Sequence, residues 1–416
     1  MSGTSKGFTT NILHSDRQKP IEHGSLHQPI HNSVAYEYRE SRDIAAVFQG
    51  RSPGFSYGRQ SNPTVTALEE KITLMEGGLA SCCFSTGMAA ITATLFSLLR
   101  SGDHLISSSF LFGNTNSLFN TLTNFGIEVS FVDATDVDAI SAARQPNTRA
   151  VFVETIANPC TQVSDLSAIG DYCELNKLLY IVDNTMTSPY LFQPRLVKAG
   201  LTINSLTKCI GGHGNVLGGA VTEMGCFDWA SFDNIHDNYK KGESNKWGIL
   251  QIKKKGLRDT GATLSADSAH HLAIGSETLA LRMQRASDNA AVLADFFNTH
   301  PLINKVFYPG IKSHPEHLRA QQLFASYGSL MSIELNEHID CFDFLNALEL
   351  TVVSSNLGDN RTLAIPVAHT IFYEMGPQRR ASMGISDGTV RLSIGIEDQQ
   401  DLLADFSQAL EKVSGE

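Results

Sequence analysis

The chain has 416 residues, of which 42% are hydrophobic and 18% charged, and its formal net charge is −11 at pH 7. This length is sufficient for two or three domains around a large shared core. The negative charge argues against a nucleic-acid-binding surface, and the one dense basic run, Lys253-Lys254-Lys255, is expected to form a solvated turn. No apolar stretch reaches the roughly 18 residues of a membrane span, so no contact with a membrane is expected.

The N-terminus and the cysteine usage predict a cytoplasmic protein. Residues 1–6 are polar and lack the apolar core of a secretory signal. The seven cysteines are odd in number and scattered, and no Cys-x-x-Cys pair occurs. This pattern predicts reduced thiols, with neither a disulfide framework nor a metal site.

Residues 1–62 are polar and irregular, which predicts an extended N-terminal arm that wraps around a partner subunit. The first clear helix begins at Pro63. Asn62 is a good N-cap, proline suits the first helical position, and Gly77-Gly78 ends the helix.

Residues 63–265 alternate between strand and helix patterns. Apolar or β-branched runs of strand length lie at 80–84, 104–107, 129–132, 150–154 and 178–182. Helical patterns separate them at 87–99, 116–125, 166–176 and 194–199. Such alternation predicts an α/β fold with a mostly parallel sheet and helices on both of its faces.

Residues 266–416 differ in character. A long helical pattern covers 267–300, strands are expected at 329–335, 350–354 and 389–394, and a closing helix is expected at 399–413. We therefore expect a C-terminal α+β domain that shares an interface with the domain before it.

Three motifs within residues 63–265 could bind a ligand. Lys208 lies between hydroxyl residues and a glycine-rich turn, which suits a Schiff-base site, although most lysines are surface residues. Asp183 follows a buried strand, where α/β ligand sites form, but an aspartate there could equally be a helix N-cap. Residues 85–90 form a strand-to-helix turn that favours a phosphate, as many tight turns of small residues do.

Together with residues 57–64 and 390–398, these motifs resemble one family. They occur in the order seen in the Cys/Met-metabolism (trans-sulfuration) family of pyridoxal-phosphate (PLP) enzymes, and the resemblance covers roughly residues 20–412. It implies the PLP-dependent transferase fold type I, with PLP as cofactor and a small amino acid as substrate. It also implies a homodimer as the minimal active unit, usually paired into a homotetramer.

The resemblance also implies a role for each matching residue. Lys208 would hold the cofactor as a Schiff base and then carry protons, and Asp183 would pair with the pyridine nitrogen. The phosphate would be held by the residues Thr86, Gly87, Met88, Ser205 and Thr207.

Four further positions match family residues. Tyr57 and Arg59 would reach the phosphate of the neighbouring subunit, and Asn158 would lie near the 3′ oxygen of the cofactor. Arg391 would clamp the substrate α-carboxylate, a task that suits the two-pronged guanidinium.

Two departures bear on the reaction. Phe112 stands where many members carry a tyrosine stacked on the cofactor ring; a phenyl ring can stack there but supplies no phenol as acid or base. Asn356 opens a segment, 356–363, that is similar to homoserine-ester sulfhydrylases, whereas the lyases usually read Ser-Leu-Gly there. The alternative is a turn whose residues serve only backbone geometry.

The leading interpretation is γ-replacement on an O-acylhomoserine, which gives homocysteine or cystathionine. The alternative is carbon–sulfur elimination by a cystathionine β- or γ-lyase or a methionine γ-lyase. A remote alternative is a non-catalytic scaffold with the PLP fold.

Overall fold

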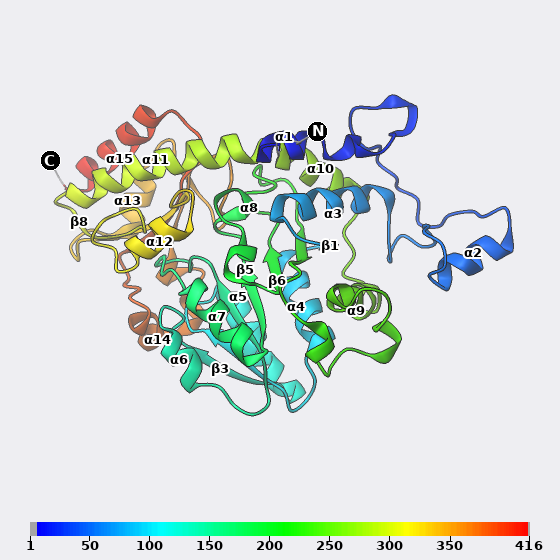
Figure 1. The fold of residues 1–416 in the computed structure, drawn as a ribbon. Helices are drawn as coiled ribbons and strands as arrows, with labels where there is room; N and C mark the ends of the chain where they lie inside the picture. The colour runs from blue at the N-terminus through cyan, green and yellow to red at the C-terminus, as the bar shows by residue number, and fades with distance from the viewer. Residues whose placement is uncertain (1–5, 415–416) are drawn as a thin grey trace.

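The computed structural model of the protein describes residues 6–414. Residues 1–5 and 415–416 lie outside the described residues. Five of the six N-terminal residues in which a secretory signal was not expected are therefore not described. The chain forms a large sheet covered by helices and a smaller sheet built from its C-terminal third, as Figure 1 shows. The predicted α/β class is confirmed.

The large sheet has seven strands in the order β1-β7-β6-β5-β4-β2-β3. All neighbouring pairs are parallel except those that involve β7, which is antiparallel to both β1 and β6. The strands are β1 (Ala80–Phe84), β2 (His104–Ser108), β3 (Glu128–Val132), β4 (Thr148–Glu154), β5 (Leu179–Asp183), β6 (Leu201–Asn204) and β7 (Gly219–Glu223). Strands β4 to β7 are almost wholly buried because helices cover both faces.

Two helices of this domain begin at side-chain caps, of which the sequence predicts Asn62. The side chain of Asn62 accepts hydrogen bonds from two backbone amides at the start of α3 (Pro63–Glu76), and Thr86 caps α4 (Gly87–Leu98) in the same way. The helix expected at 194–199 is a short 3₁₀ turn instead (Pro194–Val197). The other helices are α5 (Gly113–Leu122), α6 (Val137–Ala142), α7 (Leu166–Asn176), α8 (Ser188–Leu191) and α9 (Trp247–Gln251).

The basic run at 253–255 is not a solvated turn. It lies in a π-helical segment, Ile252–Arg258, that packs against α4. The ammonium group of Lys253 pairs with the buried Glu69 carboxylate at 3.0 Å. That buried carboxylate gives Lys253 a structural role that a solvated lysine lacks.

The smaller sheet has the strand order β10-β11-β12-β9-β8. Its strands are β8 (Ile303–Phe307), β9 (Leu330–Leu335), β10 (Val352–Val353), β11 (Leu363–Pro366) and β12 (Thr389–Ser393). The helices around it are α12 (His317–Leu323), α13 (Cys341–Ala347), α14 (Pro377–Ser382) and α15 (Gln399–Ser414). The strand expected at 350–354 is only two residues long in the structure (β10). The helix expected at 399–413 is confirmed as α15.

The long helix expected at 267–300 is two helices. Helix α10 (Ala266–Glu277) ends at Thr278, and α11 (Leu279–Thr299) continues from there. Helix α10 shares a hydrophobic cluster with α3, whereas α11 also packs against the smaller sheet. The division of the chain into 1–62, 63–265 and 266–416 stays a prediction.

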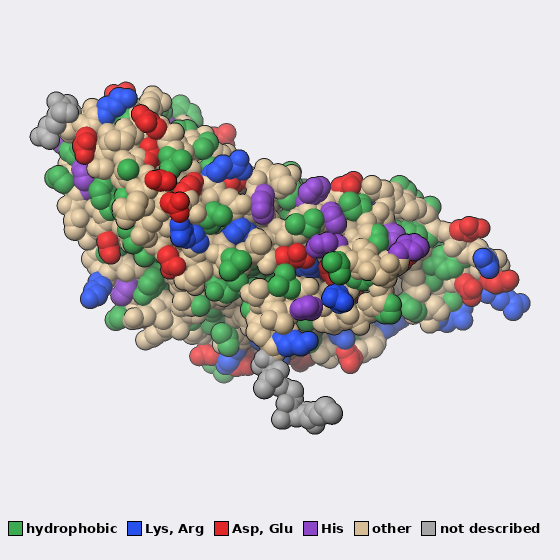
Figure 2. Space-filling model, turned by 90° about the horizontal axis from the view of Figure 1, so that it is seen from above, with side chains coloured by type: hydrophobic (Ala, Val, Ile, Leu, Met, Phe, Trp, Pro, Cys, Tyr) green, Lys and Arg blue, Asp and Glu red, His purple; other side chains and the backbone are tan. Residues whose placement is uncertain are grey.

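The N-terminal arm is partly helical. Helix α1 (Phe8–Leu13) packs against α3 and α10, and helix α2 (Ser41–Phe48) projects from the body without a buried residue, as Figure 1 shows. Figure 2 shows a group of histidines on the face that the arm and α10 form. Two of the histidines of these segments, His27 and His270, have ring centroids 6.5 Å apart.

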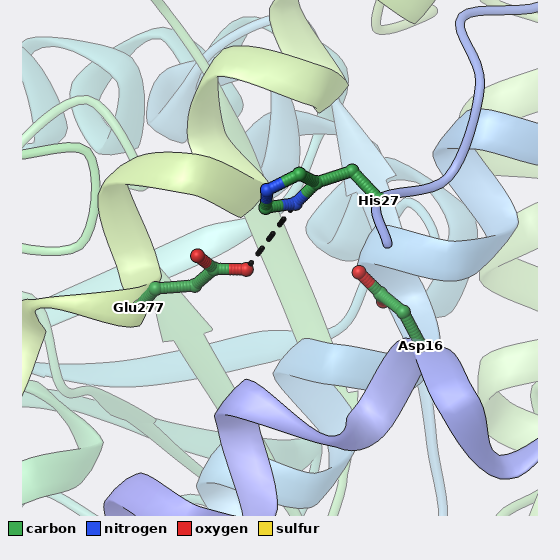
Figure 3. A group of neighbouring side chains, drawn as sticks. All are labelled: Asp16, His27 and Glu277. Atoms are coloured by element: carbon green, nitrogen blue, oxygen red, sulfur yellow. Dashed lines mark ion pairs between the residues drawn. The ribbon is translucent and has the colours of Figure 1, made fainter. Parts of the chain in front are cut away.

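A polar cluster attaches the arm to the body. His27 and Asp16 of the arm lie close to Glu277 of α10, as Figure 3 shows. The ammonium group of the buried Lys71 lies 3.4 Å from Asp16 and 3.2 Å from Glu277. Lys71 therefore supplies the positive charge that the two carboxylates need.

None of the helices within residues 6–414 is long and apolar enough to cross a membrane. All seven cysteines are free thiols, and six of them are buried.

Candidate active site

A single cavity of about 770 Å³ collects most of the predicted site residues. It lies at the N-terminus of α4 and at the carboxyl ends of β4, β5 and β6, where open α/β sheets bind ligands. The predicted residues in its wall are Thr86, Gly87, Met88, Phe112, Asn158, Asp183, Ser205, Thr207, Lys208, Asn356 and Arg391. They come from segments far apart in sequence, which the fold brings together.

Tyr57 and Arg59 do not lie in this cavity. They line a separate surface hollow, where Tyr57 is 43% exposed and the Arg59 guanidinium lies 5.5 Å from the Tyr57 ring centroid. The guanidinium also donates to the backbone carbonyl of Arg258. Their expected reach into a neighbouring subunit stays a prediction.

Lys208 follows β6 and points its amine at the C-terminal domain. Its Nζ donates to Asn356 Oδ1 at 2.7 Å. Burial, and then the positive charge of Arg391, lower the pKa of Lys208 to about 8. A sizeable fraction of the amine is therefore neutral near physiological pH, as a nucleophilic lysine requires.

Arg391 is a buried cation on β12. One of its nitrogens, Nη2, donates to the carbonyls of Ser355 and Asn356 at 3.0 and 2.8 Å. Its Nε is buried and has no hydrogen-bond partner among the described residues. Burial lowers the pKa of Arg391 to about 10. An anion such as a carboxylate would satisfy both the charge and the unpaired donor.

Two carboxyl groups, the buried Glu154 and the half-buried Asp183, lie side by side at the end of the sheet. Glu154 and Asp183 are direct neighbours in the register of β4 and β5. Burial raises the pKa of both groups, and burial together with the charge of Asp183 raises the pKa of Glu154 to about 8. The Asp183 carboxylate also accepts the Thr185 amide at 2.9 Å.

Glu154 is a further site residue that the sequence patterns did not single out. It lines the cavity, and its Oε1 accepts the backbone amide of Phe112 at 2.9 Å. The signal that identified Asp183, a carboxylate at the end of a buried parallel strand, applies equally to Glu154. Glu154 thus contacts the backbone of the predicted ring-stacking residue and lies next to Asp183.

The other end of the cavity suits a phosphate. Thr86, Gly87 and Met88 surround the N-terminus of α4, whose free amides and dipole favour an anion. A Cβ atom at Gly87 would lie 2.8 Å from Ser205 Cβ, so only glycine allows this close approach. The Thr207 hydroxyl holds the turn after β6 through hydrogen bonds with Gly218, at 3.2 and 3.0 Å.

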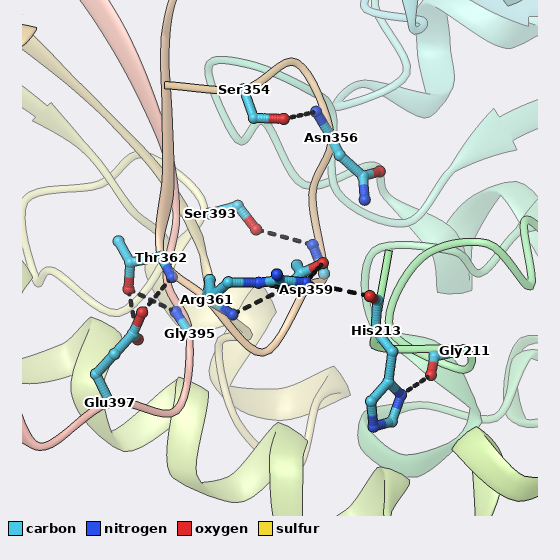
Figure 4. A network of polar contacts seen from close by, with 11 residues as sticks. Gly211, His213, Ser354, Asn356, Asp359, Arg361, Thr362, Ser393, Gly395 and Glu397 are labelled. Carbon is cyan, nitrogen blue, oxygen red and sulfur yellow. Dashed lines mark hydrogen bonds and ion pairs between the residues drawn. The ribbon is translucent and has the colours of Figure 1, made fainter. Parts of the chain in front are cut away.

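The loop 354–362 carries three residues of the cavity wall, Ser355, Asn356 and Leu357, and leads into β11; Figure 4 shows its polar contacts. The Arg361 guanidinium pairs with Asp359 at 2.8 and 3.1 Å and donates to the His213 carbonyl at 3.2 Å. The Asn360 amide donates to the Gly212 carbonyl at 3.0 Å. These contacts hold Asn356, on the same loop, against the turn that carries Lys208.

The residues of the cavity fit PLP. Two adjacent carboxyl groups, one buried and one half-buried, with no cation beside them among the described residues suit a protonated pyridine nitrogen. The amide oxygen of Asn158, also buried and unpaired, suits a hydroxyl on the ring. With a nucleophilic lysine and a phosphate-binding helix N-terminus, the fold and the site define a PLP-dependent enzyme of fold type I.

Comparison with known proteins identifies the family. Residues 9–411 match the family model of the Cys/Met metabolism PLP-dependent enzymes. The chain is 36% identical to an L-methionine gamma-lyase of Fusobacterium nucleatum subsp. polymorphum, with 98% of both chains covered. It is 35% identical to an O-acetyl-L-homoserine sulfhydrylase of Corynebacterium glutamicum, with 96% of both covered.

A solved structure agrees. A Campylobacter jejuni protein described as an O-acetylhomoserine (thiol)-lyase superposes with a TM-score of 0.92 at 32% identity, covering 98% of this chain and 100% of that one. Its crystal structure carries a pyridoxyl-lysine monophosphate. The chain belongs to the Cys/Met metabolism family of PLP-dependent enzymes, and PLP is its cofactor. It is a trans-sulfuration enzyme, which sets aside the scaffold alternative.

Proposed function

We propose that the protein catalyses γ-replacement on an O-acyl-L-homoserine, in which a thiol or sulfide displaces the acyl carboxylate from Cγ. The Cγ–O bond breaks with its electron pair leaving on the carboxylate, the Cγ–S bond forms, and the thiol proton is released. The product is homocysteine or cystathionine.

The proposal rests on one observation: the described cavity wall has a phenyl ring at Phe112 and, apart from the paired carboxyls and Lys208, no side chain that could act as a general acid. Among the described residues that line the cavity, none is tyrosine, histidine or cysteine. Apart from the paired carboxyls, Lys208 is therefore the one side chain that this chain itself contributes to the wall and that exchanges a proton near neutral pH. A phenyl ring can stack but cannot protonate a leaving group.

This composition favours a leaving group that departs without a proton. Carboxyl groups have pKa values of about 4 and thiols of about 8.5, so a carboxylate leaves as a stable anion more readily than a thiolate does. Elimination of a thiol from methionine or cystathionine gains from a general acid, whereas loss of an acyl carboxylate does not need one.

Each proposed role follows from a contact described above. The bound PLP supplies the electron sink for carbanionic charge. Lys208 binds the cofactor and then moves protons at Cα and Cβ of the substrate, aided by its lowered pKa. Arg391 holds the α-carboxylate through its unpaired Nε, and Asn356 directs the Lys208 amine.

The cofactor contacts are also proposals. Asp183 faces the ring nitrogen, Asn158 the ring hydroxyl, and Phe112 the ring face. The phosphate is held by Thr86, Gly87, Met88, Ser205 and Thr207.

The alternative is carbon–sulfur elimination, as in the lyases of the family. It is supported by the 36% identity to the F. nucleatum methionine γ-lyase, which is as high as the identity to the sulfhydrylase. Both reactions use the same cofactor residues.

Keto-acid release from L-cystathionine alone, with the product identified by mass, separates the two proposals. Pyruvate at a substantial rate would indicate a β-lyase and 2-oxobutyrate a γ-lyase, and either result would contradict γ-replacement. We expect little keto acid from an enzyme whose cofactor absorbance nevertheless responds to the amino acid.

We also propose a cytoplasmic homodimer, paired into a tetramer, in which Tyr57 and Arg59 complete the phosphate site of the neighbour. Arg59→Ala subunits mixed with Lys208→Ala subunits should then recover activity, because one site in each hybrid dimer is intact. No recovery in hybrids shown to form by native mass spectrometry would contradict the shared site.

A further inference from the structure

A carboxyl group that the proposed reaction does not use is buried behind the cofactor cavity. Glu76 is the last residue of α3 and is fully buried. Its carboxyl oxygens accept hydrogen bonds from the side-chain amide of Asn184, at 3.2 and 3.4 Å, and from that of Asn204, at 2.5 Å. Burial raises the pKa of Glu76 to about 7, although the two amide hydrogen bonds lower it. The protein thus keeps an acidic group at a place where the loss of hydration is costly.

Another buried carboxyl group of α3 has an evident structural partner. Glu69 pairs with the ammonium group of Lys253 at 3.0 Å, which compensates its charge. Glu76 forms no ion pair among the described residues, and the groups that it holds are the two amides. The location of these amides therefore indicates what Glu76 does.

The two amides belong to the ends of neighbouring strands that carry cavity residues. Asn184 follows Asp183 at the end of β5, and Asn204 precedes Ser205 at the end of β6, which is the parallel neighbour of β5. In each pair one residue lines the cavity, Asp183 or Ser205. The asparagine beside it contacts Glu76 of α3 instead. Glu76 therefore connects the two strand ends from behind the cavity.

Few other contacts hold these asparagines. The hydrogen bond to Glu76 is the one that the side chain of Asn204 makes among the described residues, and its amide oxygen is buried without a partner there. Asn184 also donates to the Phe192 carbonyl at 3.0 Å and accepts from the Thr187 hydroxyl. Glu76 and both asparagines are at most 1% exposed within one chain, so a neighbouring subunit cannot replace the contact.

The turn after β5 connects this contact to the carboxylate of Asp183. That carboxylate accepts the Thr185 amide at 2.9 Å, and the Thr185 hydroxyl accepts the Ser205 amide at 2.8 Å. Asn184 lies between Asp183 and Thr185 in the chain. A displacement of Asn184 therefore moves the backbone on which both hydrogen bonds depend.

We propose that Glu76 is a positioning residue of the cofactor site, which holds the ends of β5 and β6 together and thereby aims the carboxylate of Asp183 at the ring nitrogen of PLP. The inference rests on the proposed contact between Asp183 and that nitrogen, and it is independent of the choice between replacement and elimination. A hydrogen bond weakens steeply when its donor and acceptor are misaligned. Loss of Glu76 therefore weakens the binding of PLP through Asp183.

The test is a double-mutant cycle on the dissociation constant of PLP, obtained by titration of the apoenzyme and followed by cofactor absorbance. Glu76→Leu leaves both amides without an acceptor and should raise this constant at least about tenfold. In the Asp183→Asn background the same substitution should raise it less than about threefold. Equal effects in both backgrounds contradict the positioning role and leave the Asp183 contact in place. No effect of Asp183→Asn alone removes that contact, and the positioning role with it.

A conservative variant and a spectroscopic signature separate positioning from a general loss of stability. Glu76→Gln can keep both contacts, because the amide of Asn204 can turn over so that its unpaired oxygen accepts. It should restore the dissociation constant and the absorbance band of bound PLP. Glu76→Leu should shift that band in the same direction as Asp183→Asn, and a wild-type band in the loaded leucine variant contradicts the proposal.

Glu223 offers a matched control. It is a fully buried carboxyl group of the same sheet, and it accepts the Gly225 amide and the Trp229 indole outside the cavity wall. Glu223→Leu should lower the melting temperature as Glu76→Leu does, and it should change the dissociation constant of PLP less than about twofold. A weakening of PLP binding as large as that in Glu76→Leu would show a general effect of lost stability and overturn the proposal.

Asn204→Leu breaks the same connection from the side of β6 and replaces Glu76→Leu in the cycle if the latter does not fold. We expect weaker PLP binding and the same shift of the absorbance band. An unchanged dissociation constant in folded Asn204→Leu protein contradicts the role of Glu76.

Discussion

The amine of Lys208 donates a hydrogen bond to the side-chain oxygen of Asn356 across 2.7 Å. The two residues are 148 positions apart and belong to different halves of the chain. The backbone of Asn356 also accepts a hydrogen bond from Arg391 at 2.8 Å. One loop residue thus contacts both the cofactor lysine and the proposed carboxylate clamp.

Asn356→Asp replaces a neutral partner of Lys208 with a carboxylate. An opposite charge at this distance favours the ammonium form, so the pKa of Lys208 should rise from about 8 by about one unit or more. The pH midpoint for uptake of PLP by the apoenzyme, followed by absorbance, should rise equally. Asn356→Ser is the neutral control. An unchanged midpoint in the aspartate variant would show that this contact does not control the lysine.

Arg391→Lys keeps a positive charge but loses the planar fork. We expect KM for the amino-acid substrate to rise at least about tenfold, because a lysine cannot form the two-pronged contact with a carboxylate. Cofactor absorbance and melting temperature establish that the variant is folded and loaded. An unchanged KM in such a variant removes the carboxylate assignment.

Glu154→Gln removes an ionisable group that burial keeps protonated. The raised pKa of about 8 means that the folded protein retains this proton while the unfolded chain, with an ordinary pKa near 4.5, has released it. The contribution of Glu154 to the free energy of unfolding of the wild type is therefore fully present below about pH 4.5, and it is lost progressively as the pH rises to about 8. The glutamine variant lacks that loss, and its amide oxygen can still accept the Phe112 amide.

The difference in melting temperature between the Glu154→Gln and wild-type apoenzymes should accordingly grow between pH 5 and pH 9 in favour of the variant. Glu154→Leu, which also loses the hydrogen bond to Phe112, is the control for the neutral acceptor. A difference that stays constant over this range would mean that Glu154 is ionised throughout.

Phe112→Tyr supplies the phenol that the cavity lacks. If the absence of this acid limits elimination, keto-acid release from L-methionine should rise at least about tenfold, since a well-positioned acid typically contributes about a hundredfold or more. Phe112→Leu tests whether the ring itself is needed for cofactor binding. A loaded tyrosine variant with wild-type elimination rates would remove the argument from the leaving group.

Local sequence patterns were sufficient to predict where most helices and strands of the large domain lie. The cap at Asn62 and the strand end at Asp183 depend on neighbours in sequence, and the structure has them where the patterns place them. The order of the motifs was equally visible, and it led to the family and the cofactor.

The features that were not predicted depend on contacts between residues far apart in the sequence. The break at Thr278 separates a helix that packs on α3 from one that continues to the smaller sheet, and the apolar pattern runs through both. From the sequence alone Lys253 is expected at the surface, because its partner Glu69 lies on a helix far away in the sequence. Glu154 became a site residue only when the register of β4 and β5 put it next to Asp183.

The most direct test of γ-replacement is the partition of products from O-acetyl-L-homoserine in the presence of sulfide. Homocysteine and 2-oxobutyrate are quantified in the same reaction, with the Lys208→Ala protein as the blank. We predict homocysteine in large excess, with 2-oxobutyrate low whether or not sulfide is present. Predominant 2-oxobutyrate at saturating sulfide would contradict γ-replacement and identify the protein as an eliminating lyase.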